Sequence, residues 1–137
     1  MSIGIGAFAN LFSFDEEVVI YEYGSYNLSD ERFRNDNHIC DGYITISRNC
    51  FIEPEIHEKI KKMPSGRKKL ITKKIPVSVK YGEMIDNGKI QIINCTNCWD
   101  ISSDGRDIDR MVFSLLFNIF NQYQIIGEIP EHIYYNV

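Results

Sequence analysis

The longest regular pattern in the chain is an apolar stretch with helical spacing that runs from Ser103 to Gly127. Apolar side chains recur there every three or four residues, which is the spacing of one face of an α-helix. This face comprises Ile108, Met111, Val112, Leu115, Leu116, Ile119 and Tyr123. Three phenylalanines widen it, namely Phe113, Phe117 and Phe120. A helix that is apolar around most of its circumference is expected to be covered on more than one side.

Both ends of this predicted helix carry residues that cap helices. A carboxylate of Asp104 or Asp107 can accept hydrogen bonds from the N–H groups of the first turn. Gly127 can adopt the left-handed conformation that ends helices, and Pro130 follows it. About twenty residues suffice to cross a bilayer, but the charged and polar side chains of this stretch argue against a membrane span. We therefore predict the core helix of a soluble domain, without membrane contact.

The first half of the chain alternates between apolar and polar positions, which is the period of a β-strand. Ile3 to Phe14 forms the first such segment, with apolar residues at Ile3, Ile5, Ala7, Ala9 and Leu11. Residues 18–23 and 43–47 are rich in β-branched and aromatic residues and are predicted as the next two strands. Residues 27–38 are polar and are predicted as a long surface loop. Short or polar connections favour an antiparallel meander.

The middle of the chain predicts a short helix followed by a basic segment. The helix is expected to start at Glu53-Pro54 and to end at Pro64-Ser65-Gly66, because proline suits the first helical position. Its apolar stripe would be Ile56, Ile60 and Met63. Residues 67–75 are basic, and Leu70, Ile71 and Ile75 are expected to touch the core.

The remaining elements complete an α+β pattern. Residues 78–86 fit a short helix that ends at Asn87-Gly88, or a strand with a type I′ turn there, and we favour the helix. Residues 89–94 and 132–137 are predicted strands. Residues 1–137 are therefore expected to form a single α+β domain, with a mainly antiparallel sheet packed on the long C-terminal helix.

The net charge of −4 conceals a strong asymmetry along the chain. Between Lys59 and Lys74 there are eight basic residues and no acidic one, which leaves −12 for the rest of the protein. These residues are Lys59, Lys61, Lys62, Arg67, Lys68, Lys69, Lys73 and Lys74. Residues 1–58 carry a balance of −8. Such a distribution suits the binding of a charged partner, although a solvated basic loop on an acidic surface would give the same pattern.

The cysteines and histidines do not form a recognisable catalytic or metal-binding motif. Cys95 and Cys98 have the spacing of half a zinc site, but the other cysteines, Cys40 and Cys50, and the histidines lack the matching spacing. We expect reduced cysteines, no metal, no cofactor and no catalytic residue. The alternative from the enzyme class is a small hydrolase that uses His57 or His132 as a base. His57 is flanked by Glu55 and Glu58, which is also common on a solvated helix.

A second alternative is a nucleic-acid-associated module that uses the basic segment Lys59 to Lys74. Lysines there could contact phosphates. The segment has no interleaved aromatic residues for stacking, and the acidic remainder repels a polyanion. Direct binding of nucleic acid is therefore the less favoured interpretation.

Acidic and tyrosine side chains gather in the first forty residues. Tyrosine is common in interfaces because one end of its side chain is apolar and the other is polar. The acidic groups are Asp15-Glu16-Glu17, Glu22, Asp30-Glu31 and Asp36, and they lie beside Tyr21, Tyr23 and Tyr26. In this overall character the chain resembles the immunity proteins that bacteria pair with contact-dependent or polymorphic toxins.

The resemblance implies a non-catalytic cytoplasmic protein that binds and neutralises a cognate protein toxin, for example a nuclease domain. Loops on a rigid scaffold often carry such contacts. The expected contact residues are Tyr21, Glu22, Tyr23, Tyr26, Asp30, Glu31 and Asp36. The absence of a recognisable export signal and the four cysteines agree with a cytoplasmic location.

Overall fold

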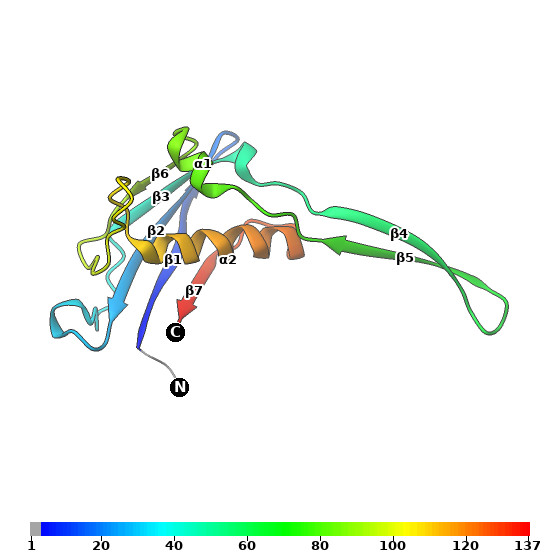
Figure 1. The fold of residues 1–137 in the computed structure, drawn as a ribbon, viewed down its shortest axis with the longest axis horizontal. Coiled ribbons are helices and arrows are strands. Elements are labelled where there is room, and N and C mark those ends of the chain that lie inside the picture. Colours follow the sequence, from blue (N-terminus) through cyan, green and yellow to red (C-terminus); the bar gives the residue numbers. More distant parts are fainter. Residues whose placement is uncertain (1–3) are drawn as a thin grey trace.

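The computed structural model describes residues 4–137 and has an α+β fold, as predicted (Figure 1). Its centre is a five-stranded sheet in the order β6-β3-β2-β1-β7, and every neighbouring pair is antiparallel. The strands are β1 (Ile5–Phe14), β2 (Val18–Asn27), β3 (Gly42–Ser47), β6 (Ile90–Ile93) and β7 (His132–Asn136). The predicted meander of the first three strands is confirmed, whereas Ile3 lies outside the described residues.

The inner face of the sheet packs against one long helix, α2 (Arg110–Ile126), which crosses it (Figure 1). Alternation along β1 places Ala7 and Ala9 on this face, where both are fully buried. The helix contributes Met111, Val112, Leu115, Leu116, Ile119 and Phe120 to the same core. The predicted core helix is therefore confirmed.

The start of α2 differs from the prediction, whereas its coverage on more than one side agrees with it. The helix begins at Arg110, and its N-cap is Asp109, whose side chain accepts a hydrogen bond from Met111 N at 3.0 Å. The two predicted caps lie upstream, in the segment that leads to the helix. Gly127 ends the helix with a left-handed φ of 83°, as expected. The sheet covers one side of α2, and Phe51 and Tyr81 pack against Phe120 and Phe113 on another. Phe117 remains 59% exposed.

The helix predicted to start at Glu53-Pro54 is wrong, because this segment forms a strand. β4 (Glu55–Lys62) pairs with β5 (Lys68–Ile75) in a separate two-stranded sheet. Leu70 and Ile71 do not touch the core, because both side chains are exposed. This hairpin projects far from the rest of the molecule (Figure 1).

Among the described residues, three short helical elements connect the strands. The preferred helix after residue 78 is confirmed as α1 (Tyr81–Asp86), which lies next to β6. β2 continues to Asn27, so the long predicted loop is shorter than expected at its start. It also contains a single 3-10 turn, η1 (Glu31–Phe33), and a second turn of this kind, η2 (Arg48–Cys50), follows β3.

Candidate functional site: the projecting basic hairpin

The β4–β5 hairpin is the most exposed part of the described structure. Every residue from Glu55 to Lys74 is exposed, and Ile75 is half-buried where the hairpin meets the body. β4 and β5 pair only with each other, so neither face rests on another element. Eight paired residues at about 3.4 Å per residue give the ribbon a length of about 27 Å.

A tight turn at the tip explains why this sequence folds back on itself. Met63 N donates a hydrogen bond to Arg67 O at 2.7 Å, and Gly66 N donates to Met63 O at 2.9 Å. Pro64 occupies the second position of this turn, where its fixed φ is favourable. Gly66 has a φ of 84°, which a residue with a side chain adopts only with strain. The sequence Met-Pro-Ser-Gly thus sets the register of the two strands.

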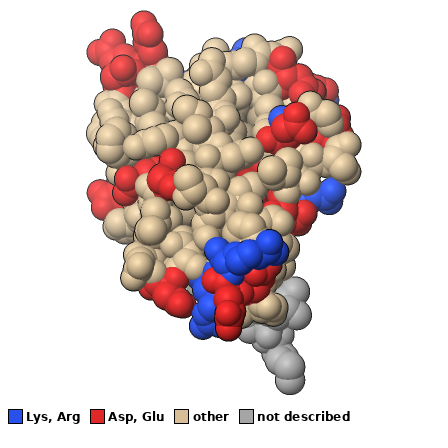
Figure 2. All heavy atoms as spheres, turned by 90° about the vertical axis from the view of Figure 1, so that its left-hand side faces the viewer, with Lys and Arg blue, Asp and Glu red and all other residues tan. Residues whose placement is uncertain are grey.

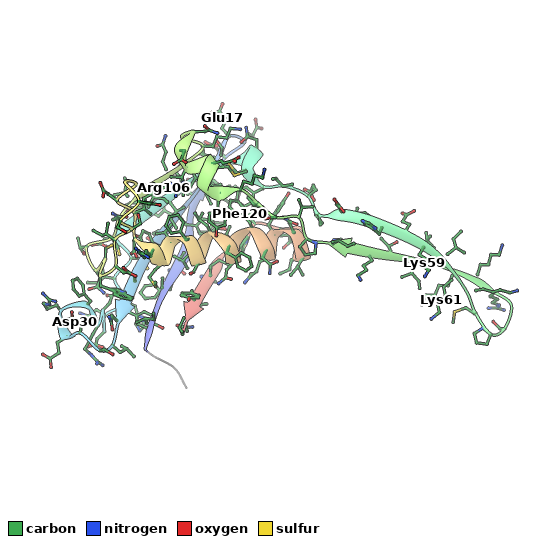
Figure 3. All side chains as sticks on the ribbon, in the orientation of Figure 1. Glu17, Asp30, Lys59, Lys61, Arg106 and Phe120 are labelled. Carbon is green, nitrogen blue, oxygen red and sulfur yellow. The ribbon has the colours of Figure 1, made fainter. Side chains whose placement is uncertain are left out.

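The register sorts the hairpin side chains onto two different faces. Directly opposite residues of an antiparallel pair share a face, and faces alternate along each strand. The first face, called the basic face here, carries Lys59, Lys61, Lys69 and Lys73 together with His57, Ile71, Glu55 and Ile75. The second, called the mixed face, carries Ile56, Glu58, Ile60, Lys62, Lys68, Leu70, Thr72 and Lys74. Lys59 and Lys61 lie in the distal half of the hairpin (Figure 3).

The distal part of the hairpin concentrates positive charge. Lys61 lies opposite Lys69, and Lys62 lies opposite Lys68. Like charges directly opposite each other destabilise a strand pair. An isolated two-stranded hairpin is also only marginally stable in water. An anionic partner would remove this repulsion, so the hairpin has the properties of a binding element.

Both ends of the hairpin are fixed to the last turns of α2. On the β4 side, Tyr123 Oη donates to Glu53 Oε1 at 2.6 Å, and the Phe51 ring packs edge-on against Phe120 and Tyr123. On the β5 side, Gln124 binds the backbone of Val77 with both ends of its amide. These contacts therefore fix the position of the hairpin base relative to α2.

Charge is divided between the hairpin and the body. Residues 55–75 carry eight basic and two acidic side chains, a balance of +6, which leaves −10 for the rest of the chain. The end of the body that faces away from the hairpin shows several acidic groups and few basic ones (Figure 2). The molecule is therefore strongly dipolar along its long axis.

Two of the predicted contact residues belong to the core. Tyr21 and Tyr23 are fully buried, because they share the inner face of β2 with Val19. Tyr21 Oη donates to Pro130 O at 2.6 Å, and Tyr23 Oη donates to Asp109 Oδ2 at 3.3 Å. Both residues stabilise the fold and do not reach a partner.

Two of the other five predicted contact residues line a concave region of about 550 Å³. Tyr26 and Asp36 line it, together with Phe8, Asn10, Arg34, His38 and Tyr134 among others. Asp30 caps η1 and forms an ion pair with Arg32 at 2.9 Å. Glu31 is exposed and Glu22 is half-buried.

The four cysteines are free thiols, and their surroundings disfavour the thiolate. Burial raises the pKa of Cys98 to about 12 and the pKa of Cys40 to about 11. Cys95 is buried between Ser25 and Asp109, and burial raises its pKa as well. Within residues 4–137, no three His, Cys, Asp or Glu side chains are grouped so that they could hold a metal ion.

The two histidines considered as bases lie far apart in the fold. His57 is on the exposed hairpin, with Nε2 at 3.1 Å from Glu55 Oε2. His132 is on the edge strand β7, with Nδ1 at 2.7 Å from Asn10 Oδ1. Each contacts one polar neighbour, and the hydrolase alternative stays a hypothesis.

No helix in the described part of the chain is long and apolar enough to cross a membrane.

Comparison with known proteins found no matching family model, no matching curated sequence and no matching solved structure.

Proposed function

We propose that this protein is a non-catalytic binding protein that engages nucleic acid through the β4–β5 hairpin. The observation that supports the proposal is the projection of eight basic side chains on an exposed ribbon that is fixed only at its base. Nucleic acid offers about one phosphate per 1.7 Å of duplex, a density of anions that matches such a cluster. Binding would also relieve the repulsion between Lys61 and Lys69.

The acidic body does not cancel the field of the hairpin, because the two are separated in space. Charges in solution are screened over about 8 Å at physiological salt, and the ribbon is about 27 Å long. The distal lysines therefore act on a polyanion beyond the reach of most body carboxylates. The charge of the body instead keeps nucleic acid away from every surface except the hairpin.

The test compares two pairs of substitutions that change the net charge equally. Lys61 and Lys69 are replaced by Gln on the hairpin, and Lys80 and Lys89 are replaced by Gln on the body. Binding to labelled DNA and RNA oligonucleotides is measured by fluorescence anisotropy at 0.1 M salt. The hairpin pair is expected to weaken binding by on the order of tenfold for each phosphate contact removed. Equal effects of both pairs, or no salt-dependent binding by the native protein, would overturn the proposal.

A second candidate function is stoichiometric inhibition of a basic protein toxin, as in the immunity proteins. The observation that favours it is the concave surface beside the loop 28–41, where Tyr26 and Asp36 lie among polar side chains. Asp36 is the acidic residue of this lining and is paired with Arg34, and Glu31 is exposed in the same loop, so these two carboxylates are the ones that a basic partner such as a nuclease domain would meet there. A cytoplasmic location belongs to both candidates, and the four free cysteines suit that reducing compartment.

The second candidate is tested with a different pair of substitutions. Glu31 and Asp36 are reversed to Lys, and Glu16 and Glu17 in the β1–β2 turn are reversed as a matched control. A pull-down from the native host supplies the partner, and its association rate is then measured at several salt concentrations. The first pair should slow association several-fold because electrostatic steering is lost, whereas the control pair should not. Recovery of nucleic acid alone would reject this candidate.

A further inference from the structure

We propose that the hairpin ligand is double-helical B-form DNA, and that the ribbon lies in its major groove with the basic face toward the DNA. This inference rests on the proposed function and names the form of nucleic acid and the side of the ribbon that contacts it. It is carried by the shape of the hairpin, by the residue types on it, and by the different composition of its two faces.

The residue types on the hairpin favour a duplex over a single strand. Proteins that bind single strands stack the bases on aromatic side chains within a positive groove. The ribbon from Glu55 to Ile75 contains no Phe, Tyr or Trp. It also projects away from the body (Figure 1), and its two strands pair only with each other, so no neighbouring element forms a groove wall along it. A duplex supplies the groove itself, and the ribbon supplies the element that enters it.

The dimensions of the ribbon select the major groove of B-form DNA. Two paired strands are about 4.8 Å apart and have side chains on both faces. The major groove of B-DNA is about 12 Å wide and admits a two-stranded ribbon, whereas the minor groove is about 6 Å wide. The major groove of A-form RNA is deep and narrow, so side chains cannot read it. The exposed length of about 27 Å lets the hairpin cross the groove while the acidic body stays outside.

The two faces of the ribbon differ in the way that a one-sided contact requires. The basic face carries four lysines, and its single carboxylate, Glu55, lies at the base and pairs with His57. The mixed face carries three lysines, but Glu58 lies among them. Ile56, Ile60 and Leu70 are also exposed there. A carboxylate beside apolar side chains is poorly placed next to phosphates, so the basic face is the one that turns toward DNA.

The closing experiment uses two triple variants of the full chain. Lys59, Lys61 and Lys73 are changed to Gln on the basic face, and Lys62, Lys68 and Lys74 are changed to Gln on the mixed face. Both triples remove three charges from the same ribbon, and β-propensity changes little from Lys to Gln. Circular dichroism and thermal unfolding confirm that both variants fold. Affinity is measured for a 20-base-pair DNA duplex, for each of its single strands and for the corresponding RNA duplex, between 50 and 200 mM salt.

The native protein is expected to bind the DNA duplex at least tenfold more tightly than the single strands or the RNA duplex. The basic-face triple should flatten the slope of log K against log salt by about two to three, because each lost phosphate contact removes about 0.9. The mixed-face triple should flatten it by less than about one. Equal effects of the two triples, or preference for single strands or RNA, would overturn this inference and leave the proposed function standing. Failure to bind any nucleic acid would overturn both.

Discussion

The side chain of Gln124 makes the two hydrogen bonds to Val77 that a neighbouring strand would make. Its Oε1 accepts from Val77 N at 2.5 Å, and its Nε2 donates to Val77 O at 2.7 Å. Gln124 is buried at the C-terminal end of α2, and Val77 follows β5 by two residues. On the β5 side, the base of the projecting hairpin is therefore attached to the core helix by this amide group.

Replacing Gln124 by Ala should destabilise the protein and loosen the hairpin base. The substitution leaves the N–H and C=O of Val77 without their partner in a half-buried place, which costs about 1–3 kcal/mol. The measurement is urea unfolding followed by circular dichroism, together with hydrogen exchange at the Val77 amide. Gln122→Ala is the matched control, since Gln122 is a half-exposed residue of the same helix turn. Equal exchange rates in the two variants would contradict the attachment.

Replacing Lys69 by Glu should strengthen the hairpin while weakening its binding. The substitution puts a carboxylate opposite Lys61 in place of a like charge, so the strand pair gains a favourable cross-strand contact. Amide protection in the distal hairpin should rise by a factor between about one and a half and five. Binding to nucleic acid should fall, because one phosphate contact becomes a repulsion. A variant with lower protection and lower affinity would show instead that the lysines serve the fold.

The five-stranded sheet and the long helix were predictable because their apolar spacings are unambiguous. In β3 the buried Ile44 and Ile46 fall at every second position, whereas the buried residues of α2 recur every three or four positions. No helix fits the first pattern and no strand fits the second. The same rule could have corrected one error at the site. Val19, Tyr21 and Tyr23 share the parity of a single strand face, which predicts that both tyrosines are buried with Val19.

The hairpin was missed because Ile56 and Ile60 are four residues apart. That spacing is close to one helical turn and is also an even number of strand positions, so both structures place the two side chains on one side. The alternating Glu and Lys residues of this segment fit helical i,i+4 pairs as well. A distinguishing signal was available in Pro64-Ser65-Gly66, which lies between two segments of equal length. Three turn residues that end in glycine are typical of a hairpin with a bulge.

Cys40 and Cys98 should react slowly with alkylating agents, and the purified protein should contain no stoichiometric zinc. Burial raises the pKa values of these two thiols to about 11 and about 12, so little thiolate is present at pH 8. An unperturbed cysteine has a pKa of about 8.5, and the greater nucleophilicity of a basic thiolate offsets only part of the difference. Iodoacetamide labelling followed by mass spectrometry should be at least tenfold slower than in urea.

Elemental analysis should find less than about a tenth of an equivalent of zinc, since only half a ligand set is present.

Asp109 should make the stability of the protein fall as the pH rises. Its carboxyl is fully buried beside Tyr23 and Cys95, and burial raises its pKa above the ordinary value of 3.8. A buried acid with a raised pKa takes up its proton on folding. Its contribution is therefore most favourable below the unfolded pKa and is lost as the pH rises through the folded pKa. Asp109→Asn removes this titration and keeps an oxygen that can accept from Met111 N at the helix cap.

Urea unfolding of the native protein and of Asp109→Asn at about pH 3 and about pH 7 tests this sign. The variant should gain stability relative to the native protein at the higher pH, because only the native chain then buries a negative charge. Asp104→Asn is a control in which the expected pH dependence of stability has the opposite sign. The Asp104 carboxyl is held by hydrogen bonds from Arg106 N and Ser102 Oγ, and these contacts lower its pKa. Its contribution is present above the unfolded pKa and is lost as the pH falls through the folded pKa, so this variant should lose relative stability at the higher pH. A stability difference that does not change with pH for Asp109→Asn would mean that Asp109 acts as a helix cap without a buried charge.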